Sequence, residues 1–202
     1  GYLESEIKNI EKQIKIITDL DKYKSRKSEL NSTITDLREK IVAAAASSKN
    51  RRDKVNLGIC ENMLPILHSD LRDNGKPYEE VFGAAESNNI EIDFSRDRTL
   101  IDGRVKFSGS SNYIKKNAFY LAALLESLSD PLYRLPRFLM LDAIENGGMR
   151  AFRSHNFQRS IVEMFKDKKD FQIILCTSMA LDDLDNDEYG VGPYYVGNVI
   201  NI

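Results

Sequence analysis

The sequence FSGSSN at residues 107–112 leads into a helical pattern from Tyr113 to Leu128, and RFLMLD follows at residues 137–142. A Ser/Gly turn that opens a helix presents free backbone N–H groups and a hydroxyl to an anion. An apolar strand that ends in an aspartate offers a carboxylate that can face a metal ion. Together these features predict half of a nucleotide site.

The segments after this stretch predict an α/β fold. Phe138–Leu141 and Ile173–Cys176 are continuous apolar runs, and a helical pattern from Phe152 to Phe165 separates them. Short apolar strands divided by a helix indicate a parallel sheet that is covered on both faces. We expect residues 191–202 to supply one or two closing strands.

The segment before the turn predicts a β-hairpin. Ile90, Ile92 and Phe94 alternate with polar residues, and a turn-like break follows at residues 95–98. A second short strand is expected within residues 99–107, so the hairpin would lead directly into the Ser108 turn.

The N-terminal segment carries a heptad-like apolar pattern with one discontinuity, which predicts a coiled coil. Its two apolar series consist of Leu3, Ile7, Ile10, Ile14 and Ile17, and of Leu30, Ile34, Leu37 and Ile41. The alternative is an amphipathic helical hairpin packed on a core. We expect residues 1–50 to form the coiled coil, with another chain or segment as its partner, and residues 51–202 to form a globular lobe that a helix around residues 55–71 enters.

Composition limits the functional classes. The 202 residues carry a formal net charge of -2, so DNA contact would be local, for example around residues 49–54. No apolar run approaches the roughly 20 residues of a membrane span, which favours a cytoplasmic protein without membrane contact. Cys60 and Cys176 are too few for a disulfide framework, and Cys176 is expected in the core.

A P-loop is missing from the sequence. The only Gly-Lys pair, Gly75-Lys76, precedes Pro77 and lacks the glycine and Ser/Thr spacing of that motif. The chain also begins at Gly1 within a helical pattern, so we expect it to be a piece of a longer protein.

The order of coiled coil, Ser/Gly turn, helix and strand ending in aspartate resembles the C-terminal half of an ABC-type ATPase head. The similar proteins are the SMC, RecN and double-strand-break-repair group, whose heads have the P-loop NTPase fold. The resemblance covers about residues 90–202, with residues 1–50 as the coiled coil. It implies ATP and Mg²⁺ as ligands, an N-terminal P-loop lobe of the same ATPase as partner, and a second head in a homodimer.

The resemblance implies a role for the turn at Ser108, Gly109 and Ser110. In that group the signature turn closes over the γ-phosphate of ATP bound by the opposite head, and a serine hydroxyl and helix N–H groups suit this task. The alternative is a Ser/Asn helix cap without ligand.

Asp142 matches the Walker B aspartate, which holds Mg²⁺. The next position normally carries the catalytic glutamate, and here it is Ala143. Three explanations stay open: an engineered change that traps ATP, a natural departure, or a shifted role for Glu145 as the carboxylate that positions water. The form with Ala143 is therefore expected to hydrolyse ATP poorly, or only through Glu145.

Two further segments match the resemblance in position. Residues 146–149, Asn-Gly-Gly-Met, fall where the D-loop begins, and their glycines would allow close approach across a dimer seam. Ser178 stands where a switch histidine is usual, and it can donate to phosphate or water. Arg150 and Arg153 would face phosphate or DNA, or lie on a helix surface.

These departures resemble the SMC-like ATPases of anti-phage systems such as Lamassu. The implied function is ATP binding and hydrolysis between two heads that sense, tether or process DNA in repair or antiviral defence, with a nuclease or effector subunit as a further partner. The alternative is a non-catalytic coiled-coil scaffold with a degenerate nucleotide site.

Overall fold

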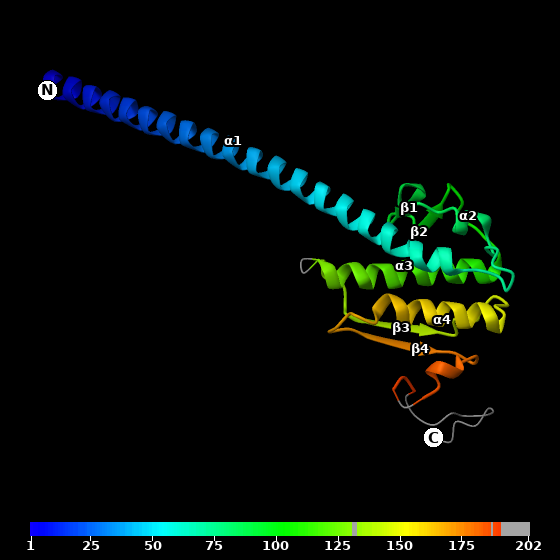
Figure 1. Cartoon of the computed structure of the whole chain (residues 1–202). Coiled ribbons are helices and arrows are strands. Elements are labelled where there is room, and N and C mark those ends of the chain that lie inside the picture. The colour runs from blue at the N-terminus through cyan, green and yellow to red at the C-terminus, as the bar shows by residue number, and fades with distance from the viewer. Residues whose placement is uncertain (131–132, 187, 191–202) are drawn as a thin grey trace. The chain divides into compact units, whose positions relative to one another are not determined.

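The computed structural model describes residues 1–130, 133–186 and 188–190. The protein has a mixed α/β fold in which a long N-terminal helix, α1 (Tyr2–Ser69), precedes small sheets and further helices (Figure 1). The later elements are α2 (Glu80–Gly83), β1 (Ile90–Asp93), β2 (Arg98–Ile101), α3 (Gly109–Ser129), β3 (Phe138–Asp142), α4 (Ala151–Phe165) and β4 (Gln172–Cys176). Two compact units result, Gly1–Arg52 and Asp53–Ile202.

The first unit is helical throughout residues 2–52. Both apolar series of the predicted seam are exposed, from Leu3 and Ile7 to Leu37 and Ile41. The alternative of a packed helical hairpin is wrong, because residues 2–52 form one helix without the turn that a hairpin requires. The exposed aliphatic stripe has the spacing of a coiled-coil seam but no covering helix among the described residues.

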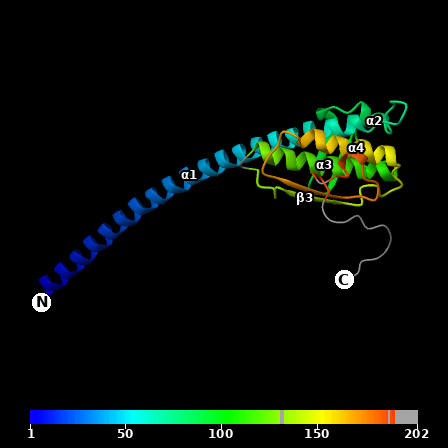
Figure 2. The ribbon, with the colours of Figure 1, turned by 60° about the horizontal axis from the view of Figure 1, so that its bottom comes forward.

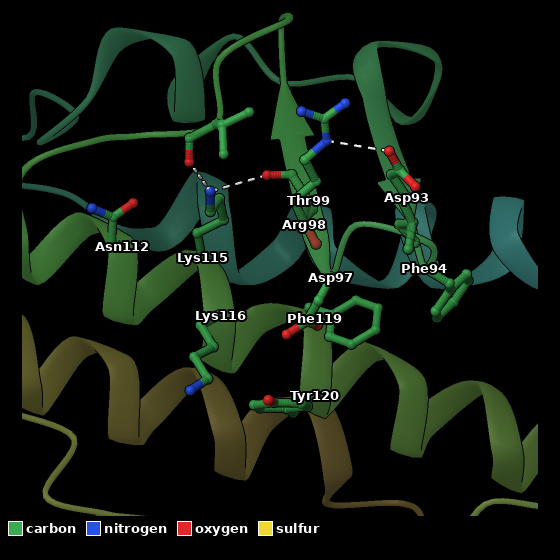
Figure 3. Close-up of a pocket in the computed structure, with 12 residues that line it drawn as sticks. Asp93, Phe94, Asp97, Arg98, Thr99, Asn112, Lys115, Lys116, Phe119 and Tyr120 are labelled. Atoms are coloured by element: carbon green, nitrogen blue, oxygen red, sulfur yellow. Dashed lines mark hydrogen bonds and ion pairs between the residues drawn. The ribbon is translucent and has the colours of Figure 1, made fainter.

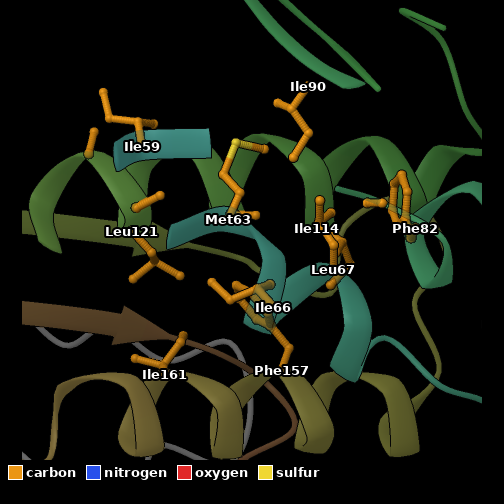
Figure 4. Close-up of a cluster of buried hydrophobic side chains, with 14 of the residues drawn as sticks. Ile59, Met63, Ile66, Leu67, Phe82, Ile90, Ile114, Leu121, Phe157 and Ile161 are labelled. Atoms are coloured by element: carbon orange, nitrogen blue, oxygen red, sulfur yellow. The ribbon is translucent and has the colours of Figure 1, made fainter. Parts of the chain in front are cut away.

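The second unit is built around the last part of α1. Ile59, Met63, Ile66 and Leu67 are fully buried at helical spacing, and they pack against α3 and α4 (Figure 4). The helix ends at Ser69, whose hydroxyl donates to the carbonyl of Ile66 at 2.9 Å. The helix thus ends two residues before the end that we predict at residue 71.

Strands β3 and β4 pair in parallel, as predicted, with Phe138 opposite Gln172 and Asp142 opposite Cys176. Helices α3 and α4 lie on the same face of this two-stranded sheet (Figures 1 and 2). Leu139, Leu141, Ile173 and Leu175 pack toward the core beneath the helices.

The prediction of a sheet covered on both faces is wrong for the described residues. Phe138, Met140 and Ile174 are exposed, and so is Cys176, which was expected in the core. The reason is the two-residue period of a strand: one set of side chains meets the helices, while the alternate set points to a face that no described element covers. The continuous apolar runs Phe138–Leu141 and Ile173–Cys176 thus supply one covered face and one bare apolar face.

The predicted hairpin is present. Strands β1 and β2 are antiparallel, with Ile90 opposite Ile101 and Asp93 opposite Arg98, so Arg98 belongs to the strand rather than to the turn. Asp93 organises the turn by accepting the N–H of Ser95 at 3.1 Å.

Two expectations concern the remaining parts of the chain. The closing strands predicted at residues 191–202 lie outside the described residues. In the described part of the chain, no helix has the length and apolar character that crossing a membrane demands.

Candidate functional site

The Ser108 turn immediately precedes α3, and Ser108 is the N-cap residue of that helix. Its hydroxyl does not cap the helix backbone; it contacts the Glu79 carboxylate at 2.9 Å and the Ser111 hydroxyl at 2.8 Å. Burial acts to raise the pKa of Glu79, but hydrogen bonds from Ser111 and Ser108 and the charge of Arg153 outweigh it, so the pKa is lowered. The negative group at this turn is therefore a carboxylate of the chain itself.

The loop after β3 touches this turn through backbone atoms. A Cβ placed on Gly147 would lie 2.7 Å from the carbonyl carbon of Gly109 and 2.8 Å from the nitrogen of Ser110. Gly147 also has φ +80, in the left-handed region that favours glycine. Gly147 thus makes a close backbone approach to Gly109 and Ser110 within the chain, and the approach across a dimer seam stays a prediction.

Arg153 lies beneath the turn and connects three helices. It is only 3% exposed, and its Nε and Nη2 donate to the two carboxylate oxygens of Asp70 at 2.7 and 2.5 Å. Nη1 donates to the Ser110 hydroxyl at 2.6 Å, and Nη2 also donates to the Ser111 hydroxyl at 2.9 Å. The expectation that Arg153 faces phosphate or DNA, or lies on the surface, is wrong, because its donors are used inside the fold; Arg150 is exposed.

Arg153 also contacts the Tyr78 ring, and it affects the pKa of Asp70. Its guanidinium lies 4.1 Å from the centre of the Tyr78 ring, which is a cation–π geometry. Burial raises the pKa of Asp70 above its ordinary value, although the hydrogen bond and charge of Arg153 oppose this. The bidentate pair holds the end of α1, the first turn of α3 and the start of α4 together.

The other predicted residues follow the ends of β3 and β4. Asp142 is exposed at the end of β3. Ala143 has φ +50, a strained conformation for a residue with a Cβ, and its N–H donates to the Cys176 carbonyl at 3.0 Å. Ala143 thus joins the two strand ends through its backbone while offering no side-chain acceptor.

Glu145 bridges from the loop after β3 to the residues after β4. Its carboxylate accepts the Ser178 N–H at 2.5 Å and the Thr177 hydroxyl at 3.1 Å. Burial acts to raise the pKa of Glu145, but these hydrogen bonds prevail and lower it, so the group is held as a carboxylate. The N–H of Ser178 is occupied by Glu145 and is not offered to a phosphate.

The described residues do not complete a metal site. No group of three or more His, Cys, Asp or Glu side chains in the described ranges could hold a metal ion. Asp142 can supply one oxygen ligand, whereas Mg²⁺ prefers six, several of them from water and substrate phosphates. Any Mg²⁺ at Asp142 therefore needs ligands from beyond these residues.

The structure brings the predicted residues into two groups. Gly109 and Ser110 meet Gly147, and Glu145 meets Ser178; Asp142 and Ala143 belong to the same strand end as the second group. Sequence reasoning missed Asp70, Glu79 and the burial of Arg153. No local pattern marks Asp70 or Glu79, since their partners are distant in the chain.

No protein-family model matches this chain, and no curated protein or solved structure matches it.

Proposed function

We propose that this chain is the C-terminal half of an SMC-like ABC ATPase head, which binds and hydrolyses ATP between two dimerised heads and acts on DNA. The observation that carries the proposal is the joint placement of Asp142, Glu145 and Ser178 at the carboxyl ends of two adjacent parallel strands. Ligands of open α/β sheets bind outside such strand ends. ATP is the substrate in this proposal, and DNA is the partner.

The strand-end residues have chemistry that suits hydrolysis. Glu145 is held ionised by two donors, which is the state that a water-positioning carboxylate requires. Asp142 would contribute one ligand of a Mg²⁺ ion, directly or through water, and the partner lobe and the nucleotide would supply the others. Ala143 adds no acceptor, so hydrolysis would depend on Glu145.

The bare face of the β3–β4 sheet supports the proposal of a missing lobe. Phe138, Met140 and Ile174 expose apolar surface on a sheet of only two strands. Exposed apolar patches of this kind mark interaction surfaces. We assign this face to the N-terminal P-loop lobe of the same ATPase, which would supply the phosphate-binding loop that this sequence lacks.

The exposed heptad-like stripe of residues 3–41 supports a coiled-coil partner. In the proposal, the helix that pairs with this stripe, parallel or antiparallel, belongs to the same ATPase. Two heads then form a homodimer. An SMC-like ATPase of this type would work on DNA in the cytoplasm, in repair or antiviral defence, with a nuclease or effector subunit as a further partner. A Lamassu-type anti-phage ATPase is the subgroup that we propose.

The test is Ser108→Arg in the head reconstituted from this chain and its P-loop lobe. Ser108 is exposed, so the substitution should leave the fold intact. Its bulk would fill the space in which the turn meets the phosphate of the opposite head, even though arginine attracts phosphate. We expect ATP-dependent dimerisation, measured by light scattering, to be lost.

Ser129→Arg is the matched control, because Ser129 is exposed at the other end of the same helix. It should dimerise as the unaltered head does, and circular dichroism should show both variants folded. Undiminished dimerisation of Ser108→Arg would show that Ser108 is only part of a helix start and that the assignment of the signature turn is wrong.

A second candidate is a non-catalytic coiled-coil scaffold with a degenerate nucleotide site. The contact between Glu79 and Ser108 favours it, because a carboxylate at this turn repels the phosphate that the ATPase requires there. Hydrolysis by the reconstituted head discriminates the two functions. If the chain is a scaffold, the reconstituted head with Ala143 should not hydrolyse ATP. If it is an ATPase that uses Glu145, the same head should hydrolyse ATP.

A further inference from the structure

A cleft of about 360 Å³ opens between the β1–β2 hairpin and α3, away from the strand ends that carry the proposed ATPase residues. Figure 3 shows its lining, which comes from residues 92–94 and 97–99 of the hairpin, Val105, and one side of α3. The volume lies within the range of small-ligand sites. All of these residues belong to the second unit.

Three aromatic rings form one wall of the cleft. Phe94 lies 6.2 Å from Phe119 in an edge-on arrangement, and Phe119 lies 5.6 Å from Tyr120. Phe94 is 59% exposed and Tyr120 is 40% exposed, so apolar ring surface is open to solvent on both sides of Phe119. Such open ring faces stack well on another flat ring.

Lys115 brings a positive charge to the same cleft. The Lys115 ammonium is nearly buried and donates to the carbonyl oxygens of Thr99, at 3.0 Å, and Val105. The ammonium also lies over the Phe107 ring, 5.2 Å from its centre, and burial lowers its pKa. Two carbonyls and a ring carry no net negative charge, so the ammonium brings a positive charge to the lining of the cleft.

The other charged groups of the cleft leave a surplus of positive charge. The Lys116 ammonium lies over the Tyr120 ring, 5.8 Å from its centre. Arg98 is paired with Asp93 at 3.2 Å, so these two charges balance. Asp97 also lines the cleft, which leaves two lysines against one aspartate.

We propose that this cleft binds one unpaired nucleotide, with its base against Phe94, Phe119 and Tyr120 and its phosphate at Lys115 and Lys116. A flat ring with an attached anion fits both the aromatic wall and the positive charge of the two lysines. The base must be unstacked to reach the rings, so the source is a single strand or a free nucleotide, rather than a duplex. This site is separate from the proposed ATPase site and does not require it.

The experiment titrates the full chain into a fluorescein-labelled oligothymidylate of about 15 nucleotides, and measures anisotropy at low salt. Phe94→Ala removes an exposed ring, and Lys116→Ala removes an exposed charge. Each should weaken binding about tenfold. Lys115→Gln, which keeps donors for the two carbonyls but removes the charge, should weaken it by a similar factor.

Phe152→Ala and Lys168→Ala are the matched controls, because both residues are exposed outside the cleft. Both should bind within about twofold of the unaltered chain, and circular dichroism should show every variant folded. Equal losses in the control variants, or unchanged binding by Phe94→Ala and Lys116→Ala, would overturn the proposal.

Two competitors separate the sources of the ligand. If unlabelled oligothymidylate displaces the labelled strand at a far lower concentration than thymidine monophosphate does, the ligand is a single strand. Equal potency of the monophosphate, with the same sensitivity to Phe94→Ala, supports a free nucleotide. Displacement by duplex DNA as effective as by the single strand would contradict the proposal, as would absence of any binding. No ATP or second lobe is used, so failure here leaves the ATPase test unaffected.

Discussion

Arg153 binds Asp70 through two nitrogen atoms, although 83 positions separate the two residues in the sequence. The pair joins the residue that follows α1 to the third residue of α4, and Arg153 also donates to Ser110 and Ser111 at the start of α3. The geometry of the signature-like turn therefore depends on a buried ion pair below it. A change at Arg153 should act on the fold and on the turn together.

Arg153→Met should destabilise the second unit by about 3–5 kcal/mol, because it leaves the Asp70 carboxylate buried without its partner. Urea unfolding followed by circular dichroism measures this change. Arg150→Met, three positions earlier and exposed, should change stability by less than about 0.5 kcal/mol. Similar effects of the two substitutions would show that the buried pair has no special weight.

Gly147→Ala should destabilise the protein by about 3 kcal/mol or more. The new Cβ would collide with Gly109 and Ser110, and alanine would also adopt an unfavourable positive φ. Gly148→Ala has the same kind of backbone, φ +77, but nothing within 4 Å of the added Cβ. It should cost only about 1–2 kcal/mol, and equal losses for the two variants in urea unfolding would refute the close contact.

Glu145 should make stability depend on pH in the acid range. Its pKa is lowered in the folded state, so its stabilising contribution is present above the unfolded pKa of about 4.3 and is lost as the pH falls through the folded pKa. The free energy of unfolding of the unaltered chain should fall more steeply between about pH 5 and pH 3 than that of Glu145→Gln, which cannot titrate there. Parallel curves would contradict the hydrogen-bonded carboxylate.

Met140→Lys should abolish association with the P-loop lobe while leaving the isolated chain folded. Met140 is 55% exposed on the bare sheet face, so a lysine there meets water in the free chain but would be buried in a complex. Co-purification and sedimentation measure the association, which should bury well over ~1,000 Å². Phe152→Lys on exposed α4 surface is the control and should bind normally; retained binding by Met140→Lys would remove the sheet face from the interface.

Glu145→Gln should lower ATP hydrolysis by the reconstituted head by about 100-fold, while ATP-dependent dimerisation persists. The amide removes the negative charge that positions or deprotonates water but keeps a similar shape. Glu163→Gln, an exposed residue of α4, should leave the rate unchanged. An undiminished rate with Glu145→Gln would exclude the shifted catalytic role that we propose for this residue.

The local elements were largely predictable from sequence. The hairpin of β1 and β2, the helices α3 and α4, and the parallel pairing of β3 with β4 follow from periodicity and from short apolar runs separated by a helix. These signals depend on neighbouring residues, because the spacing of side chains along a helix or strand is set by its own backbone. The roles that we propose for Ser108, Asp142, Glu145 and Ser178 stay predictions.

The contacts that shape the candidate site were decided only by the tertiary structure. Nothing near Asp70 or Glu79 in the sequence indicates that they meet Arg153 and Ser108, and Gly147 gives no sign that its partner is Gly109. The continuous apolar runs Phe138–Leu141 and Ile173–Cys176 likewise do not tell which face of the sheet is covered. The physical reason is that such contacts depend on how distant elements pack: sequence periodicity determines which side of an element is apolar, and tertiary packing determines what, if anything, lies against it.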